Sequence, residues 1–193
     1  MSHIVILSAP SGTGKSSVIN RIITSEALQL AFSISATNRL PRGTEQHGVE
    51  YYFLSDQEFQ NYIEQDRFIE YIEVYPGRYY GTLKSELDRI QSLGRNLILD
   101  IDVEGALEVK RKYGKEVLTI FLLPPSLEEL RHRLEGRGTD SAEVIADRLA
   151  RAEYEIGLSQ KFDMQFVNDD LERCSEEVRE AIARFLATST SGK

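Results

Sequence analysis

The feature that most constrains this chain is the segment from Leu7 to Ser17, which reads Leu-Ser-Ala-Pro-Ser-Gly-Thr-Gly-Lys-Ser-Ser. A short apolar run rich in β-branched residues, residues 3–7, comes directly before it and predicts a buried strand. After it, apolar residues recur at helical spacing from Val18 to Ile23. A loop of small residues between a strand and a helix is the context in which the pattern G-x-x-x-x-G-K-[ST] indicates phosphate binding.

The residue types of this loop explain why phosphate is the expected ligand. Backbone N–H groups can surround phosphate oxygens, and the helix that begins near Lys15 directs its positive dipole end at them. Lys15 is expected to reach the β- and γ-phosphates, and the Ser16 hydroxyl to complete the shell of a Mg²⁺ ion. Ala9 replaces the first glycine of the pattern, which alanine can do where φ is negative. The alternative is a plain strand–turn–helix with a chance lysine. The expected nucleotide-binding residues are Ala9, Pro10, Ser11, Gly12, Thr13, Gly14, Lys15, Ser16 and Ser17.

Composition limits the partners that the chain can have. Its 193 residues suit one domain, and a hydrophobic content of 41% suffices for a sizeable core. A net charge of -8, without a Lys/Arg-rich arm, argues against a nucleic-acid partner. No apolar run approaches the roughly 18 residues of a membrane span, and no secretory signal is visible. The single cysteine, Cys174, excludes an internal disulfide, so we expect a cytoplasmic protein without a membrane partner. Formation of a homo-oligomer stays open.

A second apolar run ends in carboxylates. Residues 96–102 read Asn-Leu-Ile-Leu-Asp-Ile-Asp, which predicts a central parallel strand with Asp100 and Asp102 at its carboxyl end. Both side chains lie on one face if the strand extends that far. Beside a phosphate loop they would hold Mg²⁺ or accept a nucleotide N–H or hydroxyl. The alternative is a solvent-facing strand end. We expect Ser16 and Asp100 to be the metal ligands, while a metal contact of Asp102 stays open.

Residues 33–82 predict a small sheet-rich insertion. Apolar or alternating runs at residues 32–35, 49–53 and 68–74 predict strands, and a capping box at residues 55–58 predicts a short helix to about residue 65. The loop between the first two strands carries Arg39 and Arg42, which could grip one phosphate because a guanidinium matches paired oxygens. From these residues alone, two solvated arginines are an equal alternative.

Residues 126–160 predict a hinged hairpin of two helices. A helix follows Ser126, a Gly-Arg-Gly break surrounds Arg137, and another helix begins near Asp140. Arg148 lies on that second helix, off its apolar stripe. Arginines on a hinged hairpin can close over a bound triphosphate, although single arginines on helices are usually solvated. A last strand at residues 165–167 and a helix up to residue 186 follow.

Together these stretches resemble guanylate kinase, over nearly the whole chain. The similar motifs, in chain order, are Ala9-Pro-Ser-Gly-Thr-Gly-Lys-Ser16, Ser35-Ala-Thr-Asn-Arg39 with Pro41-Arg42 and Glu45, Tyr51, Phe68-Ile-Glu70, Tyr79-Tyr80-Gly81-Thr82, Leu99-Asp-Ile-Asp102, Arg133-Leu-Glu-Gly-Arg137-Gly and Val167-Asn-Asp-Asp170. Several separate motifs in one order are more specific than the loop alone, which many ATPases and GTPases share.

The resemblance implies a fold and a reaction. The fold is α/β, a P-loop NTPase fold with a parallel-sheet core flanked by helices. It implies a core at residues 1–32, 84–125 and 161–187, a GMP-binding region at 33–83, a helical lid at 126–160 and a tail at 188–193. The reaction is Mg²⁺-dependent transfer of the γ-phosphoryl group of ATP to GMP, and to dGMP, giving ADP and GDP.

The family's site residues can be placed on matching positions of this sequence. The resemblance implies that the GMP phosphate is held by Arg39, Arg42, Tyr51 and Tyr80. It implies that Glu70 accepts from guanine N1–H and the 2-amino group, that Ser35 and Thr82 offer hydroxyls to O6, and that Asp102 helps to hold the guanosine. Arg133, Arg137 and Arg148 would close on the ATP phosphates beside the catalytic Lys15, and Asn168 would lie near adenine.

The sequence departs from the family pattern at several positions. Asn38 stands where a second threonine is usual, Arg78 replaces a common asparagine, and one extra residue lies between Glu70 and Gly77. Thr82 takes a position that is often serine, which keeps the hydroxyl, and Glu104 stands where glutamine is usual. Two other functions stay open: a non-catalytic guanylate-kinase-like binding module, and a kinase for another small acceptor or a GTPase switch. The presence of Lys15, Ser16, Arg137 and Arg148 argues against the binding module. The presence of Glu70, Ser35 and the paired arginines argues for a nucleotide acceptor with a guanine base, and so against the other two.

Overall fold

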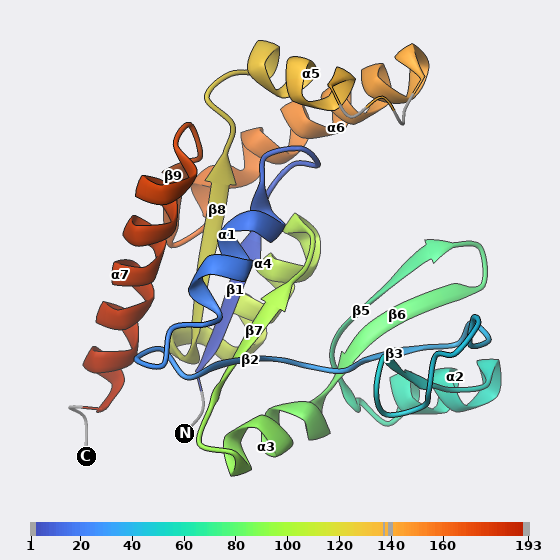
Figure 1. Ribbon diagram of the computed structural model, residues 1–193. Helices are drawn as coiled ribbons and strands as arrows, with labels where there is room; N and C mark the ends of the chain where they lie inside the picture. Colours follow the sequence, from blue (N-terminus) through green and yellow to red (C-terminus); the bar gives the residue numbers. More distant parts are fainter. Residues whose placement is uncertain (1–2, 137, 139–140, 191–193) are drawn as a thin grey trace. The chain divides into compact units, whose positions relative to one another are not determined.

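The computed structural model describes residues 3–136, 138 and 141–190. The chain divides into two compact units, one of residues 31–97 and one that joins residues 3–30 to the chain from residue 98 onward (Figure 1). The predicted division of the chain into core, GMP-binding region and lid is not tested by this partition. No helix in the described part of the chain is long and apolar enough to cross a membrane.

A five-stranded sheet has the strand order β2-β7-β1-β8-β9, and β1, β8 and β9 lie wholly in the larger unit. β1 runs parallel to β8, and β8 runs parallel to β9. The strands are β1 (Ile4–Ser8), β2 (Leu30–Phe32), β7 (Asn96–Asp100), β8 (Val117–Leu123) and β9 (Met164–Val167). All of β1 is buried, as expected for an inner strand with neighbours on both sides. The predicted α/β fold with a parallel sheet flanked by helices is confirmed.

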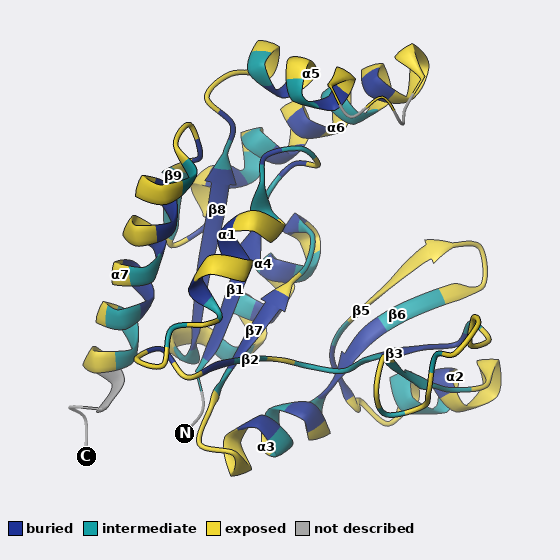
Figure 2. Cartoon of the chain, viewed as in Figure 1, coloured by how far each residue is buried: buried dark blue, intermediate teal, exposed yellow. Residues whose placement is uncertain are grey.

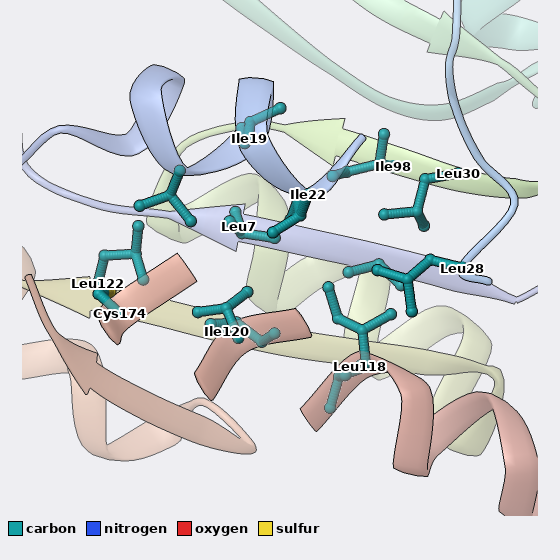
Figure 3. Close-up of a cluster of buried hydrophobic side chains, with 14 residues drawn as sticks. Leu7, Ile19, Ile22, Leu28, Leu30, Ile98, Leu118, Ile120, Leu122 and Cys174 are labelled. Atoms are coloured by element: carbon teal, nitrogen blue, oxygen red, sulfur yellow. The ribbon is translucent and has the colours of Figure 1, made fainter. Parts of the chain in front are cut away.

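Helices cover this sheet, and their apolar side chains pack against those of the strands. They are α1 (Lys15–Ile22), α4 (Val103–Tyr113), α5 (Leu127–Glu135), α6 (Ala142–Leu158) and α7 (Leu171–Thr190), with the 3₁₀ turns η1 (Gly114–Glu116) and η2 (Ser159–Lys161). One buried cluster joins α1, α7 and the sheet, with Ile19, Leu7, Ile120 and Cys174 among its members (Figure 3). Burying each such aliphatic side chain contributes about 1.5–3 kcal/mol. The cluster therefore holds the carboxyl ends of β1 and β7, where the loops begin, in fixed positions.

The helical hairpin of α5 and α6 has its own small core. Leu130 and Leu134 of α5 pack against Ile145 and Ala152 of α6. Ser126 and Ser141 cap the two helices, each accepting a hydrogen bond from the third residue of its helix. Arg137, predicted at the tip of this hairpin, lies outside the described residues.

The smaller unit contains a four-stranded sheet in the order β4-β3-β6-β5. Its elements are β3 (Ser35–Thr37), β4 (Tyr51–Phe53), β5 (Phe68–Tyr75), β6 (Arg78–Leu83), α2 (Asp56–Glu64) and α3 (Lys84–Ser92). Phe59 of α2 stacks on Phe68 of β5 with ring centroids 4.6 Å apart, and both residues are buried. Beyond its first residues, β5 is exposed towards the turn into β6, where it is yellow in Figure 2. The predicted capping box of α2 is present, with Ser55 and Glu58 bonded reciprocally.

Four predicted boundaries are wrong. The single strand predicted at residues 32–35 is not formed, because β2 ends at Phe32 and β3 begins at Ser35. The strand predicted at residues 49–53 begins at Tyr51, after a turn, and the polar tail predicted from Thr188 is helical as far as Thr190. The strand predicted over residues 96–102 ends at Asp100. Asp102 instead has the extended backbone of an N-cap, and its side chain accepts a hydrogen bond from the N–H of Gly105 in α4. A carboxylate that binds a free helix N–H ends the strand, because the chain must turn there to enter the helix.

Candidate functional site

The loop between β1 and α1 depends on two glycines. Gly12 and Gly14 have φ of 98° and 97°, in the left-handed region that glycine adopts without strain. Gly14 is the N-cap residue of α1, and the N–H of Thr13 bonds back to Pro10 O at 3.1 Å. The chain therefore curls before the helix begins, which directs backbone N–H groups towards the space in front of α1.

Two side chains that are distant in the sequence, those of Arg133 and Asn168, donate hydrogen bonds to the backbone of this loop. Asn168 Nδ2 donates to Thr13 O at 2.7 Å, and a Cβ on Gly14 would lie 2.6 Å from that same nitrogen. Arg133 Nη1 donates to Thr13 O at 3.4 Å and to Asn168 O at 3.2 Å, while its Nε pairs with Glu129. Arg133, predicted to close on the ATP phosphates, and Asn168, predicted to lie near adenine, both bond to the loop backbone and are not among the residues that line the cavity in front of it.

A cavity of about 600 Å³ opens in front of the loop. Lys15 forms an ion pair with Asp100 at the end of β7, and Arg148 Nη1 of α6 donates to Ser11 Oγ at 2.7 Å. The lining residues are Ala9, Pro10, Ser11, Gly12, Gly14, Lys15, Ser16, Ser17, Asp100, Ile101, Asp102, Val103, Arg148, Arg151 and Glu155. The cavity thus brings the phosphate-binding loop together with the predicted metal ligands Ser16 and Asp100 and with the predicted lid residue Arg148.

The residues around Asp102 fix the other wall of this cavity. Asp102 Oδ1 accepts from Gly105 N at 2.9 Å, and Ser8 Oγ donates to Ile101 O at 2.8 Å. The carboxylate therefore has one oxygen engaged by the start of α4, while Oδ2 lies 4.0 Å from Arg151 Nη2.

The smaller unit contains a second charged cluster. Arg39 donates to both oxygens of Glu45, at 2.6 and 2.8 Å, and its guanidinium lies 4.8 Å from the centroid of the Tyr51 ring. The Tyr51 and Tyr80 rings meet edge to face at 5.9 Å. Arg42 is exposed and donates its backbone N–H to Glu45 at 2.8 Å. The predicted phosphate-binding residues of this unit therefore gather around one carboxylate.

Glu45 keeps its negative charge throughout the physiological pH range. The hydrogen bonds from the Arg39 side chain, and then from the Arg42 backbone, lower the pKa of Glu45 to about 2. The same bond raises the pKa of Arg39 above its usual value. Because a carboxyl with a lowered pKa loses its pairing only as pH falls through that pKa, protonation of this pair contributes nothing to pH dependence near neutrality.

A second carboxylate of the smaller unit lies across two paired strands. Glu70 of β5 is in register with Thr82 of β6, and Thr82 Oγ1 donates to Glu70 Oε1 at 2.7 Å. Gly81 permits this close pairing, since a Cβ there would lie 2.7 Å from Glu70 O. Ser35 pairs with Tyr51 in the register of β3 and β4. The sheet therefore holds the predicted base-contacting residues Ser35, Glu70 and Thr82 in fixed strands.

Comparisons with known proteins place this geometry in a family. The family model described as guanylate kinase matches residues 1–185. A guanylate kinase of Porphyromonas gingivalis is 58% identical over 187 residues, which cover 97% of this chain and 100% of that protein. A guanylate kinase of Bacteroides thetaiotaomicron is 54% identical, covering 95% of this chain and 89% of that one. The crystal structure of guanylate kinase from Anaplasma phagocytophilum superposes with a TM-score of 0.67 at 30% identity, covering 94% of this chain and 84% of that one.

The chain belongs to the guanylate kinase family. The resemblance inferred from the sequence motifs is confirmed, and so is the prediction of an enzyme. Guanylate kinases phosphorylate GMP with ATP as the phosphoryl donor. For a member of this family, the loop cavity of the larger unit is the candidate donor site, and the cluster around Arg39 and Glu70 is the candidate acceptor site.

Sequence reasoning missed the role of Asn38 in the candidate acceptor site. This buried amide donates to Asp56 Oδ1 and to Gly77 O, both at 2.7 Å, and accepts from Tyr79 N at 2.8 Å. It therefore ties the Arg39 loop to α2 and to the turn between β5 and β6. The sequence signal was its departure from the family threonine, but neither its burial nor its three partners could be read from local sequence.

The first prediction concerns Gly14→Ala. The substitution places a Cβ at 2.6 Å from Asn168 Nδ2 in a residue with φ of 97°, so the loop must shift. We expect the Kd for MgATP, measured by calorimetry, to rise about tenfold or more, since each 1.4 kcal/mol is a factor of ten. Gly94→Ala is the control, because Gly94 has φ of 69° but nothing within 4 Å of an added Cβ. Unchanged ATP binding in Gly14→Ala would contradict the assigned role of the loop.

The second prediction concerns Asn38→Ala. The substitution removes the three hydrogen bonds that the buried Asn38 amide makes to Asp56, Gly77 and Tyr79, so we expect the free energy of unfolding to fall by about 2–4 kcal/mol. The KM for GMP should rise in the folded fraction, because Arg39 follows directly in the chain. Denaturant unfolding and steady-state kinetics measure both. Asn61→Ala is the control, since among the described hydrogen bonds the Asn61 side chain bonds only to the Gln57 side chain, one turn away on α2. Equal losses in the two variants would show that Asn38 has no special function.

Proposed function

We propose that this chain transfers the γ-phosphoryl group of ATP to GMP and to dGMP, giving ADP and GDP, in guanine nucleotide metabolism of the cytoplasm. The observation that carries the proposal is the acceptor cluster, in which Arg39 stacks on Tyr51 while Glu70 pairs with Thr82 in the same sheet. A plain ATPase or GTPase has no need of a second anion-binding cluster beside a fixed carboxylate. That combination suits a nucleoside monophosphate with a guanine base.

The donor phosphates are assigned to the cavity around the loop. The loop N–H groups would surround the β-phosphate, and Lys15 would place its positive charge at the γ-phosphoryl oxygens, where negative charge develops during transfer. Arg148 would add charge from α6. Arg133 bonds to Thr13 O and so holds the loop backbone, and Arg137 is assigned to the ATP phosphates by family resemblance.

Magnesium is the cofactor that this donor site implies. Ser16 and Asp100 line one cavity, and hydroxyl and carboxylate oxygens are the ligands that Mg²⁺ prefers. Because these donors fit the ion, we assign Ser16 and Asp100 to hold it, directly or through water. Bound there with ATP, the ion would neutralise charge on the β- and γ-phosphates.

The acceptor is assigned to the smaller unit. Arg39, Arg42, Tyr51 and Tyr80 would bind the monophosphate, with the Arg39 fork exchanging Glu45 for phosphate oxygens. Glu70 would accept from guanine N1–H and the 2-amino group, while Ser35 and Thr82 offer hydroxyls to O6. Adenine has neither donor in this arrangement and would leave a carboxylate unpaired, so the site can reject it by orders of magnitude. Asp102, in the larger unit, and Asn168 keep their proposed contacts to guanosine and adenine.

The experiment that tests this proposal is a coupled assay of ADP formation from MgATP across a panel of monophosphates. We expect turnover with GMP and dGMP, and weak turnover with AMP, CMP and UMP. Equal activity with AMP would overturn the assignment of guanine to Glu70. Absence of activity with every acceptor, in protein that binds ATP, would favour a non-catalytic binding module.

A further inference from the structure

The cavity around the loop contains an ion pair that the assignments above do not use. Arg151 and Glu155 lie one turn apart on α6, and both line the cavity. Arg151 Nε donates to Glu155 Oε1 at 2.8 Å. The Glu155 side chain is 9% exposed, whereas that of Arg151 is 63% exposed. A nearly buried carboxylate therefore holds a guanidinium whose outer part extends into the cavity.

The direction of this guanidinium is set by the bond at Nε. Arg151 Nη2 lies 4.0 Å from Asp102 Oδ2, so the Nη end of the side chain points along the cavity wall towards the start of α4. A guanidinium fixed at Nε presents its two Nη groups as a planar fork, which matches the oxygens of a phosphate.

The charges of the side chains that line the cavity show why Arg151 matters for the binding of an anionic ligand. The cations are Lys15, Arg148 and Arg151, and the anions are Asp100, Asp102 and Glu155. Lys15 already pairs with Asp100, and Arg148 donates to the loop at Ser11. Without Arg151, the lining would carry an excess of negative charge around a weakly hydrated carboxylate. Such a wall would repel a magnesium triphosphate, whose own net charge is negative.

We propose that Arg151 is a further phosphate-binding residue of the donor cavity and that Glu155 is the positioning residue that aims it. The inference rests on the proposed function, since it takes ATP to be the ligand of this cavity. The competing interpretation is an ordinary helix ion pair at i and i+4, which affects only the stability of α6.

Calorimetric titration of the protein with MgATP, without any acceptor, separates these two interpretations. The variants are R151Q, R151K, E155Q and R151Q/E155Q. The matched control is R184Q, because Arg184 pairs with Glu180 four residues away on α7, outside the cavity, at 3.6 Å. Each protein is titrated at low and at high salt, and its melting temperature is recorded.

We expect R151Q to raise the Kd for MgATP about tenfold or more, because a nearly buried carboxylate is left facing the ligand. R151K should raise the Kd less than R151Q does, since lysine keeps the positive charge. R151Q/E155Q should recover part of the loss, because the unpaired carboxylate is gone. The difference between wild type and R151Q should narrow at high salt, which screens charges, and R184Q should bind as the wild type does.

Other results would overturn the inference, the proposed function or both. A melting temperature that falls in R151Q while the Kd stays at the wild-type value would overturn the inference and leave a helix ion pair. Because binding is measured without an acceptor, a protein that binds MgATP but does not phosphorylate GMP would overturn the proposed function without touching this readout. Failure of the wild type to bind MgATP would overturn both.

Discussion

Lys15→Met is expected to lower kcat for GMP phosphorylation by about 10³-fold or more at saturating MgATP, because it removes a fixed positive charge from the γ-phosphoryl group. Lys15 begins α1 directly after the curled loop and pairs with Asp100, so its ammonium is held inside the donor cavity. The side chains of Lys15 and Asp100 are 20% and 35% exposed. Loss of a partly solvated pair should change the free energy of unfolding by no more than about 1 kcal/mol.

Lys110→Met is the matched control for this variant. Lys110 also pairs with an aspartate, Asp163, at 2.9 Å, and donates to Val117 O at 2.7 Å, but it does not line the donor cavity. We expect it to destabilise the fold by about 1–3 kcal/mol while the folded protein keeps its activity. Steady-state kinetics and denaturant unfolding of both variants give the comparison. If Lys15→Met kept more than a tenth of the wild-type kcat, the catalytic role of Lys15 would be wrong.

Glu70→Gln is expected to raise the KM for GMP by about 10²-fold, because an amide nitrogen replaces one oxygen that accepts from guanine. The register of β5 and β6 fixes Glu70 opposite Thr82, whose hydroxyl donates to Oε1 at 2.7 Å. The carboxylate is therefore held in one orientation before a base arrives. The KM for ATP should stay within about twofold of the wild-type value, because no donor contact is assigned to Glu70.

Glu73→Gln tests whether the effect belongs to the position or to the charge. Glu73 lies on the same strand, is exposed, and accepts from Gly77 N at 2.7 Å. The Glu73→Gln substitution removes the same charge from β5 but does not change a residue of the assigned base site, so the KM for GMP should hardly change. Equal weakening of ATP and GMP in Glu70→Gln would mean that Glu70 supports the sheet and does not select the base.

Short-range features of the fold could be predicted from the sequence. The capping box at Ser55 and Glu58, the strand that precedes the phosphate-binding loop and the helix that begins at Lys15 all depend on residues close together in the chain. The prediction for residues 96–102 was wrong at its end because two local patterns compete there. Alternation favours a longer strand, but an aspartate three residues before a helical N–H is a better cap, and packing of α4 against the sheet decides between them.

The candidate sites were predicted only as sets of residue types. Lys15, Glu70 and Arg39 were named from motifs, but their partners Asp100, Thr82 and Glu45 were assigned only by the structure. Arg151 carried no signal at all, because an arginine on a helix is ordinarily solvated. The assignment of Arg151 depends on its hydrogen bond to Glu155 and on its position 4.0 Å from Asp102.

The sequence by itself determined the phosphate-binding loop, the strand and helix on either side of it, and the family. These follow from short runs of residues whose backbone preferences and apolar spacing act locally. The tertiary structure alone decided which polar and charged groups meet: Lys15 with Asp100, Asn38 with Gly77, and Arg151 with Asp102. Such encounters join segments far apart in the chain, and their positions depend on how whole layers of side chains pack, which no local pattern encodes.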